Sequence, residues 1–385
     1  MLRFRLHSLE ILRRLPSSAM AALPDDLVLE RIEPGDTTSE ESQDDSRVAA
    51  DRIRGRVEGQ GVRFLDTDAA LRAHGETLRK YFGSVGSSGD DPLGALNGAA
   101  WGGGSFVYVP PGVHVDFPLQ ADMLENARKV GPFERTLVIA DEGAHVEFID
   151  GCTSPLYPSQ SLSAAVVEVV ALPGSRVRYI EFQNWTKEVS NLVLKRAHAH
   201  RGATMEWLDA NIGSRVTRNA PEVRLLGPDA RAEVVGISLA GADRHYEVGA
   251  HVAHEAPHTS SHIECRSAVQ GGAATHRLSV SVAPGATGAR SSVRWSALLL
   301  DGRSRCLTFP SVEIDEADAA VAQEGSAEKI SEETLFYVMS RGFSRAEAVN
   351  LLVLGLLDVF LKRIPMEYAV EFNRLIALEL EGAVG

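Results

Sequence analysis

A recurring turn chemistry constrains this chain more than any other feature of its sequence. Between Thr136 and Asp301, short turns marked by glycine or proline separate runs in which apolar and polar residues alternate. Such alternation is typical of β-strands that bury one face. Because the turns recur with no helical segment between them, we predict a stack of coils, a parallel β-helix, and keep a two-sheet sandwich as the alternative. The turns are Glu142-Gly-Ala144, Pro173-Gly-Ser175, Arg201-Gly-Ala203, Gly227-Pro-Asp229, Gly271-Gly-Ala273 and Pro284-Gly-Ala286.

The sequence on either side of this stretch predicts other structure. Upstream, we expect a strand at Val62–Leu65 and a helix from Asp68 to Phe82. Downstream of Ser331, the apolar period changes from about 2 to about 3.6 residues, which indicates helices. The predicted order is an N-terminal helix with an acidic linker (1–60), an α/β segment (61–104), a β-helix core (105–320) and a C-terminal helical subdomain (321–385).

We expect three helices in the C-terminal subdomain. Ser331 and Ser344 are N-cap residues, the second in a capping box with Glu347, and Met366 opens the last helix after Pro365. Their apolar content exceeds what one buried helix face needs. The helices are therefore predicted to pack on the coils and also to bind a partner, with a simple cap over the last coil as the alternative.

Composition narrows the functional classes. The 385 residues carry a formal net charge of −13, which argues against a nucleic-acid-binding surface of clustered Lys and Arg. The apolar run Leu351–Leu357 is far too short to span a bilayer, so we expect no membrane segment. Three cysteines without C-x-x-C spacing indicate a reducing compartment, so we expect a cytoplasmic protein. We interpret the Arg-rich amphipathic pattern within residues 1–35 as a docking helix rather than a targeting peptide.

From about residue 60 onward, several motifs occur in the order in which one known family carries them. On these motifs the chain resembles the SufB/SufD family of iron–sulfur cluster assembly scaffolds, and it is closer to the SufB branch. The motifs are Ala95-Leu-Asn97, Gly103-Gly-Ser-Phe-Val-Tyr-Val-Pro110, Phe133–Gly143, Asp150-Gly-Cys-Thr-Ser-Pro155, Ala164-Ala-Val-Val-Glu168, Gln183-Asn-Trp185, Thr308-Phe-Pro310, Leu335-Phe-Tyr337, Ser340-Arg-Gly342, Pro365-Met-Glu367 and Leu380-Glu-Gly-Ala-Val-Gly385.

The resemblance implies a right-handed parallel β-helix flanked by helical ends. It implies a complex with SufC, an ABC-type ATPase that docks on the C-terminal helices, and with a SufD-type paralogue or a second copy. It also implies that a cysteine desulfurase or sulfur-transfer protein supplies sulfur, and that a transient iron–sulfur cluster forms between the two β-helix subunits. The chain itself has no G-x-x-x-x-G-K-[ST] loop, so a partner would bind the ATP.

Cys152 is the strongest candidate for chemistry. It stands in Gly151-Cys-Thr-Ser-Pro155, where glycine and proline predict an exposed turn. An accessible thiolate is what a sulfur acceptor needs, and the resemblance assigns the sulfur entry point to this position. The alternative is a buried cysteine that only packs, which is also our interpretation of Cys265.

Two further candidates follow from the resemblance, with departures from the SufB pattern. The SufB cysteine and histidine positions before Thr308-Phe-Pro310 are Ser304 and Leu307 here, and Cys306 lies two residues after Ser304. A shift of two residues keeps the same strand face, so Cys306 is a candidate sulfur carrier or cluster ligand, with packing as the alternative.

The Glu-His-Glu stretch of SufB is reduced here to Ala322, Gln323 and Glu324. Glu324 is thus a candidate cluster ligand, although a carboxylate is a harder donor than thiolate or imidazole. The ligand set is incomplete.

Several histidines near the later strands form a second candidate site, for a metal ion. His251-x-x-His254 and His258-x-x-x-His262 have spacings that neutral imidazoles can use to bind a divalent metal. On a strand, however, His251 and His254 point to opposite faces. We therefore predict no metal site and interpret these histidines as polar residues of the outer face.

Three functions remain for the chain. The first is a scaffold subunit of a Suf-type assembly complex that accepts sulfur and is not itself an enzyme. The second is a non-ligating, SufD-like structural subunit, favoured by the lost cysteine and histidine positions. The third is a stand-alone β-helix enzyme, which would need a clustered carboxylate or histidine site on the outer face of the coils.

Overall fold

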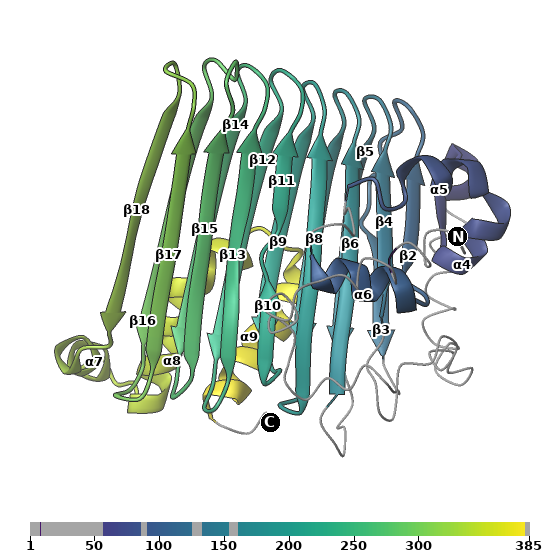
Figure 1. The fold of residues 1–385 in the computed structure, drawn as a ribbon. Coiled ribbons are helices and arrows are strands. Elements are labelled where there is room, and N and C mark those ends of the chain that lie inside the picture. The colour runs from purple at the N-terminus through teal and green to yellow at the C-terminus, as the bar shows by residue number, and fades with distance from the viewer. Residues whose placement is uncertain (1–7, 9–56, 86–90, 125–132, 154–160, 382–385) are drawn as a thin grey trace.

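The computed structural model of the chain describes Ser8 and residues 57–85, 91–124, 133–153 and 161–381. Strands form two long sheets that face each other, and successive strands pass from one sheet to the other (Figure 1). With one exception, each strand pairs in parallel with strands of the neighbouring coils. The chain is therefore a parallel β-solenoid, as predicted, and the two-sheet sandwich is excluded.

The first sheet, called sheet A, has ten strands among the described residues. They are β1 (Arg63–Asp66), β2 (Ser105–Val109), β4 (Arg135–Ala140), β6 (Ser161–Ala171), β8 (Val189–Ala199), β10 (Val216–Asn219), β11 (Glu222–Leu225), β13 (His245–His254), β15 (Ala273–Val282) and β17 (Arg305–Ile314).

In the part of the chain that the structure describes, the second sheet, sheet B, has eight strands. They are β3 (Leu119–Leu124), β5 (His145–Thr153), β7 (Arg176–Asn184), β9 (Thr204–Ile212), β12 (Arg231–Ala240), β14 (Ser260–Val269), β16 (Arg290–Leu299) and β18 (Ala320–Lys329).

A ladder of backbone hydrogen bonds joins the turns along one rim of the solenoid. In each of these turns one residue has a positive φ of 58–70°, and its N–H donates to a carbonyl of the next turn at 2.8–3.1 Å. Glycine adopts this backbone conformation without steric cost, which explains the recurring turn glycines of the sequence. The residues are Gly143, Gly174, Gly202, Asp229 and His258.

The space between the sheets is apolar near this rim. Phe148, Tyr179 and Trp207 occupy one row across β5, β7 and β9, and their ring centroids follow each other at 5.2 and 4.9 Å. All three side chains are fully buried. Burial of such large rings is a major stabilising contribution, because each removes on the order of 150–250 Å² from water.

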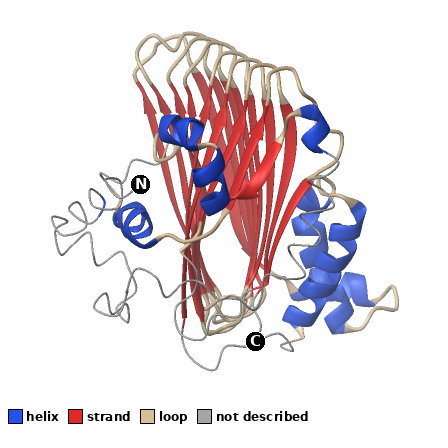
Figure 2. Cartoon of the chain, turned by 90° about the vertical axis from the view of Figure 1, so that its right-hand side faces the viewer, coloured by secondary structure: helices blue, strands red, loops and turns tan. Residues whose placement is uncertain are grey.

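The N-terminal segment covers one end of the solenoid and part of sheet A. Helices α4 (Thr67–Ala73) and α5 (Gly75–Tyr81) lie across that end, and α6 (Pro92–Ala100) lies on the outer face of sheet A (Figure 2). The predicted single helix from Asp68 to Phe82 is thus two helices that meet at His74. A short 3-10 helix, η2 (Glu58–Gln60), precedes β1.

The C-terminal helices return along the outer face of sheet B (Figures 1 and 2). They are α7 (Glu332–Met339), α8 (Arg345–Leu361) and α9 (Met366–Leu380). Ser331 caps α7, and Ser344 with Glu347 forms the predicted capping box of α8. The solenoid continues through β18, so the helical part starts at Glu332 rather than at residue 321.

Apolar side chains of α8 and α9 bind these helices to sheet B. Val353, Phe360 and Ile376 are buried against outward-facing residues of the sheet such as Ile180 and Leu208. The predicted packing of the helices on the coils is therefore confirmed. No helix in the described part of the chain is long and apolar enough to cross a membrane. The amphipathic pattern and the acidic linker predicted within residues 1–60 fall almost wholly outside the described residues.

Candidate functional site

Cys152 lies within strand β5 and not in a turn. Its backbone pairs with Met123 of β3 and with Gln183 of β7. The prediction of an exposed turn is therefore wrong for Gly151, Cys152 and Thr153. These residues continue the backbone pairing of β5 up to its last residue. The Cys152 side chain is outside the described part of the structure, whereas these two pairings define its register position.

That register position belongs to a row of polar residues. From Cys152 the ladder of sheet B leads to Gln183, Asn211, Ser238 and Ser267, one residue per strand. All four are buried between the sheets, with exposed fractions of 3% or less. Buried polar groups are costly without hydrogen bonds, so this row marks a part of the interior built for polar contacts.

A buried ionic cluster lies beside this row. The Lys195 ammonium of β8 reaches across the interior to Glu181 and, at 2.5 Å, to Asp209. Burial raises the pKa of Asp209 to about 6, although Lys195 opposes this shift. Burial alone would lower the pKa of Lys195, but the two carboxylates outweigh it and the pKa is raised. The Asn219 amide also donates to Glu181.

Cys306 stands at the end of a matching row in sheet A. The ladder leads from Asn191 of β8 through Thr217, Tyr246 and Ala274 to Cys306 of β17. Cys306 is half-buried and packs against the apolar cluster around Tyr246. Burial raises the pKa of its thiol.

One hydrogen bond joins the two rows. The Asn191 amide donates to Oε1 of Gln183 at 3.1 Å, although the two residues belong to opposite sheets. The Oδ1 atom of Asn191 has no partner among the described residues, so an acceptor still faces the interior. The register row of Cys152 and the row that ends at Cys306 therefore meet in a single polar zone inside the solenoid.

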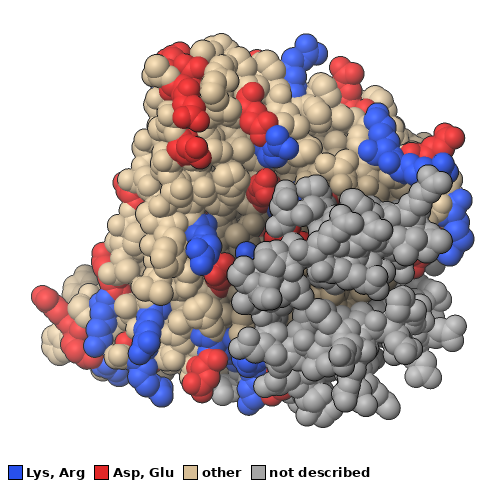
Figure 3. Space-filling model, viewed as in Figure 1, with Lys and Arg blue, Asp and Glu red and all other residues tan. Residues whose placement is uncertain are grey.

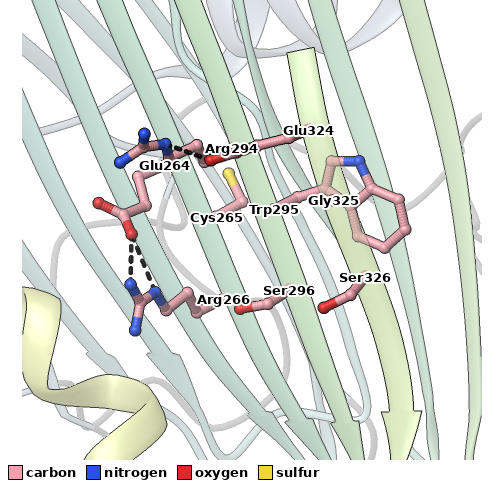
Figure 4. Close-up of a pocket in the computed structure, with 9 residues that line it drawn as sticks. All are labelled: Glu264, Cys265, Arg266, Arg294, Trp295, Ser296, Glu324, Gly325 and Ser326. Atoms are coloured by element: carbon pink, nitrogen blue, oxygen red, sulfur yellow. Dashed lines mark hydrogen bonds and ion pairs between the residues drawn. The ribbon is translucent and has the colours of Figure 1, made fainter.

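The structure does not bring Glu324 to Cys306. Glu324 lies on β18 in sheet B and points to the outer face, where Arg294 holds it at 2.6 Å (Figure 4). A pocket of about 330 Å³ opens there, between β14, β16 and β18, with a second pair of Glu264 and Arg266 at its side. Within one chain, Glu324 and Cys306 therefore face different surfaces.

The chain matches two models of one protein family. The family model described as "SUF system FeS cluster assembly, SufBD core domain" matches residues 123–356, and the model "SufBD protein N-terminal region" matches residues 50–121. The chain belongs to the SufBD family.

Curated SufBD relatives agree with this assignment. The chain is 44% identical to the iron-sulfur cluster assembly protein SufB of Bacillus subtilis over 345 residues, which are 89% of this chain and 74% of the relative. It shares the same identity and coverage with a SufBD family protein of Staphylococcus epidermidis and is 43% identical to one of Staphylococcus aureus.

Of two positions at which the chain departs from the SufB pattern, Ser304 has hydrogen-bond partners of its own, and Gln323 is placed by its register. The Ser304 hydroxyl donates to the Val269 carbonyl at 2.8 Å and accepts from the Gly271 N–H at 3.0 Å. Ser304 thus fixes the turn before β17. Gln323 lies on β18 at the register position of Val293, on the inner face of the last coil.

Cys265 and His254 have structural roles in this SufBD chain. Cys265 is 1% exposed, and burial raises the pKa of its thiol to about 12, which confirms that it packs. His254 is buried inside the solenoid and bonded to Thr259 and Ser261, so its predicted place on the outer face is wrong. Among the described residues, no three His, Cys, Asp or Glu side chains are arranged to hold a metal ion.

The C-terminal helices keep exposed apolar side chains on the sides turned away from sheet B. Phe336 of α7 is 73% exposed and Met366 of α9 is 80% exposed. Such exposure is unusual for a surface that stays in water. The other large apolar residues exposed on or between these helices are Tyr337, Met339, Phe343, Leu351 and Val370.

The face of sheet A shown in Figure 3 is electrically mixed. Acidic and basic side chains are interspersed over its described part, and several form ion pairs across strands, such as Arg224 with Glu255 and Arg277 with Glu247. Pairs of this kind neutralise each other locally, so this face does not offer a basic stripe.

Sequence reasoning missed the polar zone, although a signal was present. In β7, Tyr179, Glu181 and Gln183 share the parity of buried Val177, so they had to face the interior. The pattern places charged residues on the inner face of a strand without saying what neutralises them. The partner, Lys195, becomes visible only when the two sheets are placed together.

Proposed function

We propose that this chain is a scaffold subunit of a Suf-type iron–sulfur cluster assembly complex, and that it accepts sulfur at Cys152. The family assignment supports the general role. The observation that carries the finer proposal is the Gln183–Asn191 contact, which joins the register row of Cys152 to the row that ends at Cys306. A polar interior between two thiol positions suits the passage of a polar sulfur species.

The sulfur-accepting step is an exchange between thiols. The Cys152 thiolate attacks the terminal sulfur of a persulfide on a cysteine desulfurase or sulfur-transfer protein. The donor thiolate leaves, and Cys152 carries the persulfide. No net oxidant is required, because the sulfur arrives already in the persulfide state. Cys306, half-buried at the last coil, is the proposed second sulfur carrier.

The partner ATPase is proposed to dock on the C-terminal helices. The exposed apolar side chains of α7 and α9 support this, because α8 and α9 already bury their other sides on sheet B. A motor that pulls α7 would act on β18 directly, since only Ile330 and Ser331 separate the two elements. The second β-helix subunit would meet the open end formed by β17 and β18.

A non-ligating, SufD-like subunit is the second candidate. Ser304 and Gln323 replace the cysteine and histidine of the resemblance, and Ser304 is fully used in its turn. The remaining candidate ligand, Glu324, is held by Arg294 on the outer face. In this case the chain would support a cluster whose ligands come mainly from its partner.

Anaerobic reconstitution separates the two candidates. The purified chain is treated with ferrous iron, a cysteine desulfurase and cysteine. Its visible absorption spectrum is then recorded to detect sulfur-to-iron charge-transfer bands. A scaffold shows these bands and loses them in Cys152→Ser, whereas Cys265→Ser, the buried control, retains them. A colourless chain that still takes up persulfide sulfur at Cys152 indicates the SufD-like role, and a chain that takes up no sulfur contradicts the proposal.

A further inference from the structure

A buried histidine near the last coil lacks a partner on one of its two ring nitrogens. His276 of β15 is fully buried and faces the interior of the solenoid, where its Nε2 atom lies 2.6 Å from the Ser267 hydroxyl of β14. Its Nδ1 atom has no hydrogen-bond partner among the described residues. A buried polar atom left unpaired is costly, so a ligand bound to this nitrogen would be stabilised.

A second histidine, His254, is equally buried and shows that burial alone does not leave a ring nitrogen open. Both of its nitrogens are hydrogen-bonded, Nδ1 to Thr259 at 2.8 Å and Nε2 to Ser261 at 2.9 Å. Burial lowers the pKa of His254 and of His276 to about 4, so both imidazoles are neutral at neutral pH. The two rings thus share their burial and their charge, and they differ in the open Nδ1 atom of His276.

The hydrogen bonds around Ser267 suit a tautomer with a free lone pair on Nδ1 of His276. The Ser267 hydroxyl lies 2.7 Å from the Ser238 hydroxyl of β12. When Ser267 donates to Ser238, its oxygen accepts the Nε2–H of His276, and Nδ1 then carries a lone pair. Histidines that bind metals in proteins are usually held in this way, with one nitrogen donating to a neighbouring group and the other bound to the metal.

A thiol occupies a neighbouring position on the same inner face. In the ladder of sheet A, His276 is the register partner of Thr308 on β17, and Cys306 is the preceding inner residue of that strand. Burial raises the pKa of the Cys306 thiol, and a hydrogen bond with the Thr308 side chain opposes this shift. From the ordinary spacing of strands and residues, the Cα atoms of His276 and Cys306 are about 8 Å apart. One metal ion can join two such side chains, because its bonds to nitrogen and sulfur are about 2.0–2.3 Å long.

The two donors lie at different depths. Cys306 and Thr308 are half-buried in the last coil, and His276 is fully buried one coil deeper. A thiolate with a neutral imidazole is a donor pair that suits iron and other transition metals better than magnesium or calcium. Among the described residues no three His, Cys, Asp or Glu side chains are grouped to hold a metal ion. Two donors therefore suit an ion that is taken up and passed on better than one that stays.

We propose that His276 and Cys306 together bind ferrous iron inside the last coils, with Nδ1 of His276 and the sulfur of Cys306 as the two protein donors. On binding, the Cys306 thiol releases its proton to water and the thiolate binds the ion, so no oxidant or reductant is needed. The inference rests on the proposed function only for the fate of the iron, which is cargo for cluster assembly. It adds a donor residue that the sequence comparison with SufB does not indicate.

Cobalt binding to the full-length chain tests this pair of donors. Co²⁺ is a coloured substitute for ferrous iron, and a bound thiolate gives it a sulfur-to-metal charge-transfer band. All samples carry Cys152→Ser, so that the band reports on Cys306. We expect the band in this parent chain, its loss on Cys306→Ser, and a Co²⁺ affinity at least tenfold weaker on His276→Ala. The matched control is His254→Ala, which removes an equally buried histidine without an open nitrogen and should bind Co²⁺ like the parent.

Circular dichroism of the same samples shows which variants fold. If His276→Ala does not fold, His276→Gln takes its place, because the amide can still donate to Ser267 and is a much weaker metal ligand than imidazole. A folded His276 variant that binds Co²⁺ as tightly as the parent overturns the inference, and so does a parent chain without the charge-transfer band. Excess ferrous iron, added anaerobically, should compete with Co²⁺ and reduce the band, and a band that it leaves unchanged would overturn iron as the ligand.

Two outcomes separate this inference from the proposed function. A chain that takes up persulfide sulfur at Cys152, but whose metal binding does not depend on His276, overturns the inference and still supports the proposed function. A chain that binds metal through His276 and Cys306, but takes up no sulfur at Cys152, supports the inference and contradicts the proposed function.

Discussion

The indole ring of Trp295 occupies the space that a side chain at Gly325 would fill. The two residues are register partners on β16 and β18, and a Cβ built at position 325 would overlap the ring. The φ of Gly325 is not in the left-handed region, so the backbone conformation does not require glycine. Glycine is required because there is no room for a Cβ atom. The ring also lies edge-on to His276, at 5.9 Å between centroids, and so helps to close the last coil.

We predict that Gly325→Ala displaces Trp295 and loosens β18. Overpacking of this kind typically costs about 1–3 kcal/mol of unfolding free energy. Thermal unfolding should show the loss, and the fluorescence of Trp295, measured against a Trp295→Phe reference, should shift to the red. Gly302→Ala is the matched control, because a Cβ there meets nothing within 4 Å. Equal melting temperatures for the two variants would contradict the prediction.

Removal of the Lys195 charge should be among the most damaging single changes. Lys195→Met leaves Glu181 and Asp209 buried without their cation, which typically costs about 3–5 kcal/mol. Urea denaturation followed by circular dichroism measures the loss. The triple variant with Glu181→Gln and Asp209→Asn removes the uncompensated charge and should recover most of the stability. If Lys195→Met alone unfolds within about 1 kcal/mol of the wild type, the cluster is not a closed ionic unit.

Acid should destabilise the solenoid through two buried histidines. Burial lowers the pKa of His254 and of His276 from 6.5 to about 4. Between about pH 4 and pH 6.5, the unfolded chain binds more protons than the folded chain. The stabilising contribution of the two neutral histidines is therefore complete above about pH 6.5 and is lost as the pH falls toward 4. The loss can reach about 3 kcal/mol for each histidine.

Unfolding midpoints at several pH values check this expectation. His254→Asn should flatten the fall in stability below pH 6.5. Val252→Ala, a buried apolar change on the same strand, should lower stability by a similar amount at every pH. Parallel curves for the wild type and His254→Asn would show that this histidine does not contribute to the acid sensitivity.

The described thiols should differ sharply in reactivity. Cys306 is half-buried, whereas Cys265 is 1% exposed with a pKa raised by burial to about 12. At neutral pH, iodoacetamide should therefore modify Cys306 in the folded protein and Cys265 only after unfolding. Peptide mass spectrometry reads both sites in one sample, and comparable labelling of Cys265 in the folded protein would show that the solenoid opens.

Exposed apolar residues of the C-terminal helices should matter for binding and not for stability. Phe336→Ser and Met366→Ser remove side chains that are mostly in water, so each should change the unfolding free energy by less than about 0.5 kcal/mol. If the proposed partner ATPase docks on these helices, each variant should weaken its binding at least tenfold in titration calorimetry. Arg63→Ser, exposed on β1 at the other end, is the control and should bind normally.

Local sequence patterns predicted the repeating parts of the fold well. The turn glycines, the period-2 runs, and the N-caps at Ser331 and Ser344 depend on neighbours in sequence, and each lies where it was expected. The end of the solenoid was predicted at residue 320, with the helical subdomain from residue 321, because the residues of β18 include few apolar ones that would mark a strand. Its parallel pairing with β16 holds these residues in a strand, which their own sequence pattern does not indicate.

The candidate site was harder to predict because it depends on which sheet and which face each residue occupies. Cys306 and Glu324 are close in sequence, but the turn at 315–319 sends them to different sheets. Parity then turns Cys306 inward and Glu324 outward. Contacts such as Gln183–Asn191 cross the interior between sheets, and no spacing rule within one strand reveals them.

The hydrogen-bonded turns along the rim keep the spacing between successive coils constant. Neighbouring strands of a sheet are about 4.8 Å apart, so every coil adds a fixed length between the N-terminal end at β1 and the last coil at β17 and β18. Excising one whole coil would shorten the body by that increment without changing either end, whereas deletion of a few residues would break the ladder. The number of coils therefore sets how far an element bound at one end stands from the chemistry at the other.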